Sequence, residues 1–287
     1  MADPNDAVVE AWNTVLFDKF QRFRHLLGDG LAAHSDAALD RHPFPPGARV
    51  LDVGCGFGDS TRAIARMVGP AGGAVGVDCA PRFVRAAEDA SRAAGVANAA
   101  FRVADVQADD LSGPYDFAFS RFGTMFFPLP GAALANVRRA LKPGGTLTMI
   151  VWRRREENPW LYEAEQRVRA IVPVVAHEDT DQVHCGPGPF SMAGPDTVSG
   201  MLRAAGWDRI AFERFDADIC IGRDLDEAIA FAMALGPAGE IMRLAGDEGA
   251  RRAPQVAAAL REALASFVRA DGVRAPSSTW FVTARSP

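Results

Sequence analysis

The organisation of the chain follows from one stretch of sequence, Val50-Leu51-Asp52-Val53-Gly54-Cys55-Gly56-Phe57-Gly58-Asp59-Ser60-Thr61. Its apolar start predicts a buried strand, and three glycines at alternate positions predict a tight loop that leads into a helix. Glycine permits positive φ and lets a ligand approach the backbone closely. The helix that follows would offer unpaired N–H groups and a positive dipole end to an anionic group. This stretch therefore predicts a cofactor loop between a strand and a helix.

The spacing of the glycines separates two classes of cofactor. A dinucleotide fingerprint reads G-x-G-x-x-G, whereas this loop reads G-x-G-x-G and has an acid, Asp52, two residues before its first glycine. A carboxylate would repel a diphosphate but attract the ammonium of an amino acid. The loop therefore favours a cofactor that carries an amino-acid group over NAD.

Two further acids follow later strands. Asp78 comes directly after the apolar run 74–77, 20 residues beyond Gly58, and Asp105 follows the run 101–103. A carboxylate at the first position can accept both hydroxyls of a ribose, and the second can accept an adenine amino group. Because the carboxyl ends of parallel strands meet at one edge of a sheet, we expect these acids to line one site.

Apolar runs alternate with helical patterns through most of the chain. This alternation predicts parallel β-α-β units wound into one sheet. Helices are expected at 7–27 and 31–39, before a Pro-rich boundary at 42–47. The expected strands are 50–53, 74–77, 101–103, 116–120, 146–152 and 279–284, with one or two more strands over 210–221. We divide the chain into an N-terminal helical cover (1–46), a cofactor-binding core (47–152), an insert or lid (153–195) and a C-terminal completion of the sheet with a helical insertion (196–287).

Five segments in order resemble the motifs of class I S-adenosylmethionine-dependent methyltransferases, and more narrowly the ubiquinone/menaquinone-type branch, which acts on small molecules. They are Asp52–Gly58, Gly76–Asp78, Ala104–Val106, Tyr115–Arg121 and Leu141–Gly145. The resemblance covers about residues 48–152. It implies an α/β fold with a doubly wound, mostly parallel seven-stranded Rossmann-like sheet, whose antiparallel last strand lies between strands five and six.

The resemblance also implies S-adenosyl-L-methionine as cofactor, with S-adenosyl-L-homocysteine as product. Asp52 would lie near the methionine amine, Asp78 would bind the ribose, and Asp105 would bind the adenine. The full set of implied cofactor contacts is Asp52, Gly54, Cys55, Gly56, Gly58, Asp78, Cys79, Asp105, Val106 and Ser120. The Asn/Asp-Pro-Pro-Tyr motif of many enzymes that methylate DNA or protein amino groups is absent after the fourth strand, which disfavours such substrates.

The acceptor side is less defined by the sequence. Aromatic residues of the first helix and the residues after the fourth strand are the expected substrate contacts: Trp12, Phe20, Arg121 and Phe122. Methyl transfer by in-line displacement needs positioning, a dry pocket and sometimes a base. The candidate catalytic residues are His184, His25 and Arg121. Two alternatives stay open, an NAD-dependent oxidoreductase and a non-catalytic domain that binds S-adenosylmethionine or S-adenosylhomocysteine.

The composition excludes several other classes of protein. Of 287 residues, 48% are hydrophobic and 23% are charged, and the net charge of -5 disfavours broad nucleic-acid binding. No apolar run reaches the roughly 18–20 residues of a membrane span. Four distant cysteines and an acidic N-terminus favour free thiols in the cytoplasm, and no metal site is expected. The run Arg153-Arg154-Arg155-Glu156-Glu157 is typical of a solvated, self-paired surface.

Overall fold

The glycine-rich stretch lies between a central strand and a helix, as expected. β1 (Arg49–Val53) ends at the glycine loop, and α5 (Asp59–Val68) begins directly after it. In the computed structural model, which describes residues 4–173 and 187–287, β1 pairs in parallel with β2 (Gly73–Asp78) on one side and with β4 (Tyr115–Arg121) on the other. The cofactor loop therefore emerges from the middle of a parallel sheet.

The strand order confirms the predicted sheet and adds one short strand. The order is β3-β2-β1-β4-β5-β8-β6, and β8 is antiparallel to both β5 and β6, so the expected last strand does lie between strands five and six. The extra strand, β7, pairs with β8, and its two residues are too few to show a periodic pattern. The remaining strands are β3 (Ala99–Val103), β5 (Leu141–Trp152), β6 (Asp208–Gly222), β7 (Val268–Arg269) and β8 (Gly272–Arg285).

Alternate residues of the central strands pack on opposite faces of the sheet. Val50 and Ile150 belong to one buried cluster with side chains of the helices α4 and α5. Their chain neighbours Leu51 and Met149 belong to another cluster, which includes side chains of α7 and α9. This period of two, with helices over both faces, is the doubly wound arrangement that the sequence predicted. The flanking helices are α4 (Ala32–Arg41), α6 (Pro81–Ala93), α7 (Pro130–Ala140) and α9 (Pro195–Ala204).

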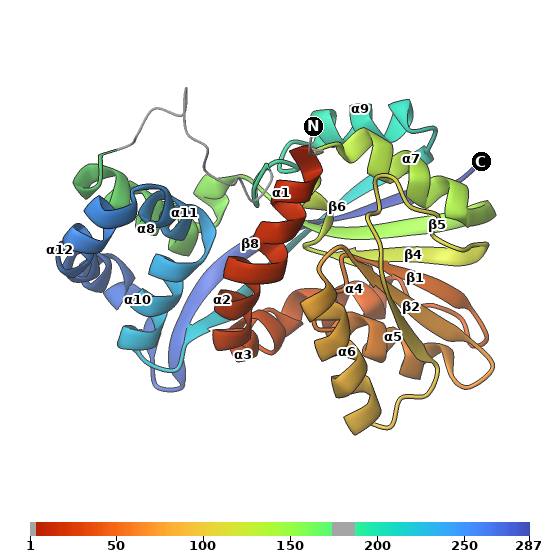
Figure 1. Cartoon of the computed structure of the whole chain (residues 1–287), viewed down its shortest axis with the longest axis horizontal. Coiled ribbons are helices and arrows are strands. Elements are labelled where there is room, and N and C mark those ends of the chain that lie inside the picture. Colours follow the sequence, from red (N-terminus) through yellow and green to blue (C-terminus); the bar gives the residue numbers. More distant parts are fainter. Residues whose placement is uncertain (1–3, 174–186) are drawn as a thin grey trace.

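A separate group of helices packs beside the sheet, at the left of Figure 1. We call it the helical group; it consists of α8 (Pro159–Ile171), α10 (Leu225–Ala234), α11 (Gly236–Leu244) and α12 (Gly246–Leu264). α8 packs on α11 and α12, so helices from both sides of the predicted boundary at 195 join one unit. α11 was not among the expected elements; Pro237 lies in its first turn, where proline is favoured.

The N-terminal helices cross the middle of the molecule in Figure 1, between the helical group and the parallel strands. The single helix expected over 7–27 is divided into α1 (Pro4–Ala11), a π-helical turn (Trp12–Leu16), α2 (Phe17–Arg22) and α3 (Arg24–Gly28). π-Helical turns are rare and often lie at functional sites. Among the residues that the structure describes, no helix has the length and apolar character that crossing a bilayer requires.

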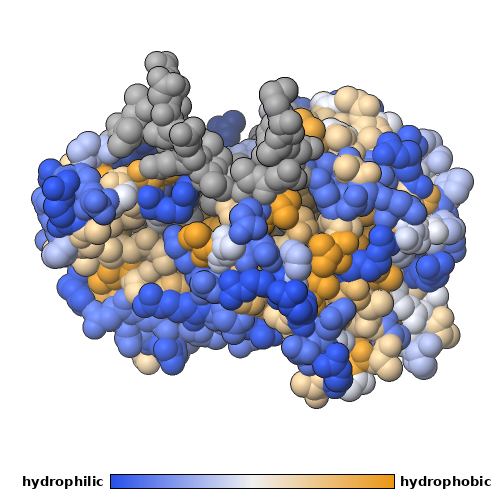
Figure 2. Space-filling view, viewed as in Figure 1, coloured by the Kyte–Doolittle hydropathy of each residue, from blue (hydrophilic) through white to orange (hydrophobic). Residues whose placement is uncertain are grey.

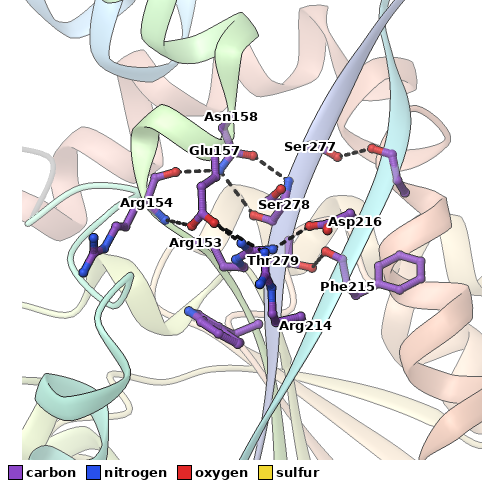
Figure 3. A network of polar contacts seen from close by, with 12 residues as sticks. Arg153, Arg154, Glu157, Asn158, Arg214, Phe215, Asp216, Ser277, Ser278 and Thr279 are labelled. Carbon is purple, nitrogen blue, oxygen red and sulfur yellow. Dashed lines mark hydrogen bonds and ion pairs between the residues drawn. The ribbon is translucent and has the colours of Figure 1, made fainter.

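A buried polar junction fixes the start of the helical group to the sheet (Figure 3). The Asn158 carboxamide accepts the Ser278 N–H at 2.9 Å and donates to the carbonyls of Arg154 and Ser278 at 3.1 and 3.2 Å. Beside it, Arg153 donates to Asp216 at 2.6 Å and pairs with Glu157. Because Asn158 immediately precedes α8, this junction sets where that helix begins relative to β8.

We expect Asn158→Ala to lower the free energy of unfolding by about 2–4 kcal/mol, because it removes three hydrogen bonds and leaves the Ser278 N–H of β8 without its acceptor. Asn13→Ala is the matched control. The Asn13 carboxamide accepts one hydrogen bond, from the Arg82 N–H at 3.0 Å, and we expect its loss to cost about 1 kcal/mol. Urea denaturation measures both variants. Equal losses would contradict the role given to Asn158.

Candidate active site

A large cavity of about 810 Å³ lies at the carboxyl ends of the parallel strands. Its wall includes residues that follow or end five neighbouring strands: Gly56 after β1, Asp78 at the end of β2, Asp105 after β3, Arg121 at the end of β4 and Trp152 at the end of β5. Figure 2 shows apolar side chains exposed in the middle of this face of the molecule. A cavity of this size at a sheet's carboxyl edge has room for a small-molecule ligand.

The three glycines of the loop all have positive φ but perform different tasks. φ is 68° at Gly54, 52° at Gly56 and 74° at Gly58. A Cβ on Gly58 would lie 2.6 Å from the ring of Phe101, so this glycine permits close packing of α5 on the sheet. A Cβ on Gly56 would meet no atom within 4 Å, and Gly56 lines the cavity. Gly56 is therefore the position where a ligand can approach the backbone.

Asp78 presents a half-buried carboxylate to the cavity. One of its oxygens accepts the Gly56 N–H at 3.0 Å and the other accepts the Ala80 N–H at 3.0 Å. Burial raises the pKa of Asp78 to about 6, against the opposing effect of these two N–H donors. Each oxygen keeps a lone pair, so the carboxylate can accept a pair of neighbouring hydroxyls as a ribose offers them.

The third acid, Asp105, also lines the cavity, together with Val106 and Cys79. An oxygen of Asp105 accepts hydrogen bonds from the backbone N–H of Gln107 at 2.9 Å and from its side chain at 3.2 Å. Gln107 lines the cavity as well, although the sequence pattern did not single it out. Cys55 is buried at the base of the loop and contributes to the same wall.

Two other expected cofactor contacts, Asp52 and Ser120, are fully buried and do not line the cavity. Asp52 accepts hydrogen bonds from the hydroxyls of Ser60 at 2.7 Å and Thr61 at 2.6 Å, and burial raises its pKa. Ser120 donates to the Val53 carbonyl at 2.8 Å. Asp52 thus holds the first turn of α5, and Ser120 ties β4 to β1. Direct contact of either with a cofactor stays a prediction.

The residues that follow Ser120 do reach the cavity. Arg121 lines it, and within the described part of the chain no carboxylate lies within 4.0 Å of its guanidinium. Burial lowers the pKa of Arg121. Phe122, also in the wall, has a positive φ of 59°, which is uncommon for an aromatic residue and is often a mark of a functional site.

The aromatic residues of the N-terminal helices line the cavity near the second strand's end. The ring of Trp12 lies 5.3 Å from that of Phe20, 6.4 Å from that of Phe83 and 5.0 Å from that of Phe126. Trp12 and Phe20 both belong to the cavity wall. Because Phe83 lies on α6, shortly after Asp78, these rings cover the side of the cavity where Asp78 lies.

Only one of the two candidate histidines, His25, is among the described residues, and it is not part of this wall. His25 lies outside the cavity lining, and its Nε2 is 3.1 Å from a carboxylate oxygen of Glu227 on α10. The structure thus gives no support to a general-base role for His25. His184 lies outside the described residues.

A row of four aromatic rings forms another part of the wall, which we call the ring wall: Phe122, Trp152, Trp160 and Phe231. Phe122 stacks on Trp152 with centroids 4.4 Å apart, Trp152 meets Trp160 edge-on at 6.2 Å, and Trp160 stacks on Phe231 at 5.9 Å. Only Phe122 was expected from the sequence. The others come from β5, α8 and α10, and no local motif marks them.

Comparisons with known proteins agree with this arrangement. Residues 50–145 match a family model described as a methyltransferase domain. The chain is 32% identical to nocamycin O-methyltransferase of Saccharothrix syringae over 173 residues, which cover 56% of this chain and 60% of that protein. It is 27% identical to the ubiquinone/menaquinone biosynthesis C-methyltransferase of Bordetella avium (strain 197N) over 225 residues, or 76% and 86% of the two chains.

A solved structure has a similar fold. Haemonchus contortus phosphoethanolamine N-methyltransferase 2, in complex with phosphomonomethylethanolamine and S-adenosylhomocysteine, aligns with a TM-score of 0.56 and 15% identity. The alignment covers 100% of this chain and 61% of that chain. At this identity the likeness concerns the fold.

The two tasks within the glycine loop can be separated by one pair of substitutions. We expect Gly58→Ala to lower the free energy of unfolding by about 2–4 kcal/mol, since a Cβ adds both a clash with Phe101 and left-handed strain. Gly56→Ala adds only the strain, about 1 kcal/mol, but places a methyl group in the cavity. Denaturation and calorimetric titration with S-adenosylhomocysteine measure the two effects. Unchanged binding by Gly56→Ala would contradict the ligand position assigned to that loop.

Proposed function

We propose that this chain, which belongs to the class I S-adenosylmethionine-dependent methyltransferases, transfers a methyl group to a small, largely apolar organic acceptor. The family and the cofactor class predicted from the sequence are confirmed by the family match and the relatives. One observation carries the proposal: a single cavity joins the glycine loop and two strand-end acids to the ring wall. We call these its cofactor half and its acceptor half.

The residues of the cofactor half fit S-adenosylmethionine. The open space at Gly56 lets the ligand lie against the loop, and Asp78 offers two carboxylate oxygens to the ribose hydroxyls. Asp105 and Val106 would hold the adenine. Arg121, which has no carboxylate partner among the described residues, lies in the wall beside the loop and would attract the carboxylate of the methionine group. Trp12 and Phe20 would cover the adenosine rather than contact the acceptor.

Chemistry at this site would depend on positioning. When bound, S-adenosylmethionine supplies a methyl group on a positively charged sulfur, which departs as a neutral thioether. The chain therefore has to align the acceptor with that methyl group and keep water out. The ring wall supplies a flat apolar surface for this, and no histidine is among the described residues that line the cavity.

The acceptor class is supported by the relatives and by the composition of the wall. The two curated relatives are named for O-methylation of nocamycin and for C-methylation in ubiquinone and menaquinone biosynthesis, so both point to a small organic acceptor. The net charge of -5 further disfavours a nucleic acid. We place the protein in the cytoplasm, where the free thiols of Cys55, Cys79 and Cys220 would persist.

Binding of the cofactor separates this proposal from its alternatives. Calorimetry should show micromolar binding of S-adenosylmethionine and S-adenosylhomocysteine and no binding of NAD. The reverse result would favour the oxidoreductase. Formation of S-adenosylhomocysteine with a phenol or quinol acceptor would then exclude a purely binding domain, whereas failure of transfer to a broad set of small acceptors would favour one.

The pKa of Asp78, about 6, gives the binding a pH dependence. Because only the carboxylate can accept both hydroxyls, protonation below pH 6 removes the ribose contact. We expect the affinity for S-adenosylhomocysteine to fall about tenfold between pH 7 and pH 5. Asp78→Asn should weaken binding about 10- to 100-fold at pH 7 and flatten the pH profile.

Asp116→Asn is the control for Asp78→Asn. Asp116 lies near the start of β4, at the opposite edge of the sheet, and pairs with Lys142 at 2.5 Å. The Asp116→Asn variant should keep the wild-type affinity for S-adenosylhomocysteine and the wild-type pH profile. An unaltered profile in Asp78→Asn would contradict the ribose assignment.

A further inference from the structure

The face of α8 that lines the cavity changes character along the helix. Trp160, Leu161, Glu165 and Arg169 all belong to the cavity wall. The last three are spaced four residues apart, so they lie along one helix face at intervals of about 6 Å. The first turn is apolar and joins the ring wall, whereas the third turn is charged. The acceptor half therefore has an apolar part and, about 6–12 Å farther along α8, a polar part.

The charged part is a cluster of two arginines on one carboxylate. Arg155 lies 2.9 Å and Arg169 lies 2.7 Å from the same oxygen of Glu165, and Arg155 also donates to the other oxygen at 3.0 Å. Within residues 4–173 and 187–287, no second carboxylate lies within 4.0 Å of either guanidinium. This cluster carries a net charge of +1. Glu240, which also lines the cavity, is paired with Arg243 at 2.7 Å.

The exposure of the cluster shows which of its members can meet a ligand. The Glu165 side chain is 1% exposed, whereas those of Arg155 and Arg169 are 42% and 43% exposed. Arg155 bonds Glu165 through Nη1 alone, which leaves N–H groups of its guanidinium for another acceptor. Its guanidinium also lies 5.5 Å from the centroid of the Phe190 ring. Glu165 thus holds two positively charged donors in the wall without neutralising both.

We propose that the methyl acceptor carries an anionic group, a carboxylate or a phosphate, which Arg155 and Arg169 bind while its apolar body lies against Trp152, Trp160 and Phe231. This rests on the proposed function, because it assigns the acceptor half of the same cavity. A separate cation, Arg121, also lines the cavity, and it lies beside the glycine loop. Gly123, two residues after Arg121, packs on Gly54 so closely that a Cβ on Gly54 would lie 3.0 Å from the Gly123 Cα. The cofactor's own carboxylate therefore has a partner elsewhere, and the cluster on α8 remains for the acceptor.

Three probes of matched shape test the proposal: 2-naphthoate, 2-naphthyl phosphate and the uncharged 2-naphthamide. Each is titrated into the full chain by calorimetry, with and without saturating S-adenosylhomocysteine. We expect at least one anion to bind about tenfold more tightly than the amide, as a charge-assisted contact would provide. The preference should shrink as salt is raised, because the arginines are partly exposed. The anion that binds more tightly identifies which anionic group the acceptor carries, a carboxylate or a phosphate.

Variants assign the preference to the cluster. Arg155→Gln and Arg169→Gln should each reduce the preference for the anion about threefold or more, and the double variant should abolish it. Arg169→Lys should keep much of it, because the charge is retained. The matched control is Arg252→Gln, since Arg252 is also 42% exposed and pairs with Glu248 at 2.7 Å but does not line the cavity. Melting temperatures verify that all variants fold.

Two results would overturn the proposal. One is equal or absent binding of all three probes by the wild-type chain, and the other is an unchanged preference in the double variant. Neither depends on the cofactor, because the preference is also measured without S-adenosylhomocysteine. A chain that shows the preference but binds no S-adenosylhomocysteine would contradict the proposed methyl transfer and leave the anion site standing.

Discussion

The site depends on the position of β1 between two parallel neighbours. From β1 the chain passes through α5 to β2 on one side, while β4 occupies the other side. The connections after β1 and β4 therefore lead to opposite faces of the sheet, and a crevice opens where they part. The glycine loop lies in this crevice. A side chain at Gly54 would collide with the backbone of Gly123, which follows β4, so the crevice requires glycine at that point.

The two halves of the cavity are held by different means. The cofactor half is built on strand ends, whose relative positions follow from the backbone hydrogen bonds of the sheet. The acceptor half is built on α8 and its partner helices, which pack beside the sheet and are fixed to it through Asn158 and the long β6–β8 pair. A common cofactor needs the first kind of rigidity.

Burial gives chemically identical groups different tasks at this edge of the sheet. Asp52 and Asp78 come from neighbouring strands, yet their carboxylates have different surroundings. Asp52 accepts hydrogen bonds from two hydroxyls of α5, whereas Asp78 lines the cavity. Arg153 is a second example, and its burial differs from what the residues around it in the sequence suggest. It stands in a run that suggests a solvated surface, but it is buried over the Trp280 ring between Asp216 and Glu157. Its near neighbour Arg155 instead lines the cavity.

The sequence by itself determined the parallel sheet, the glycine loop, and the order of the acids Asp78 and Asp105. Short local patterns predict these features, and their geometry follows from the backbone pairing of the strands. Only the tertiary structure decided that Asp52 turns inward, and that Trp160 stacks on Phe231 from a helix 71 residues farther along the chain. Contacts of that kind leave no local pattern, because they depend on how distant amphipathic helices pack against one another. For that physical reason the cofactor could be predicted from the motifs, whereas the acceptor half that we propose rests on contacts of the folded cavity.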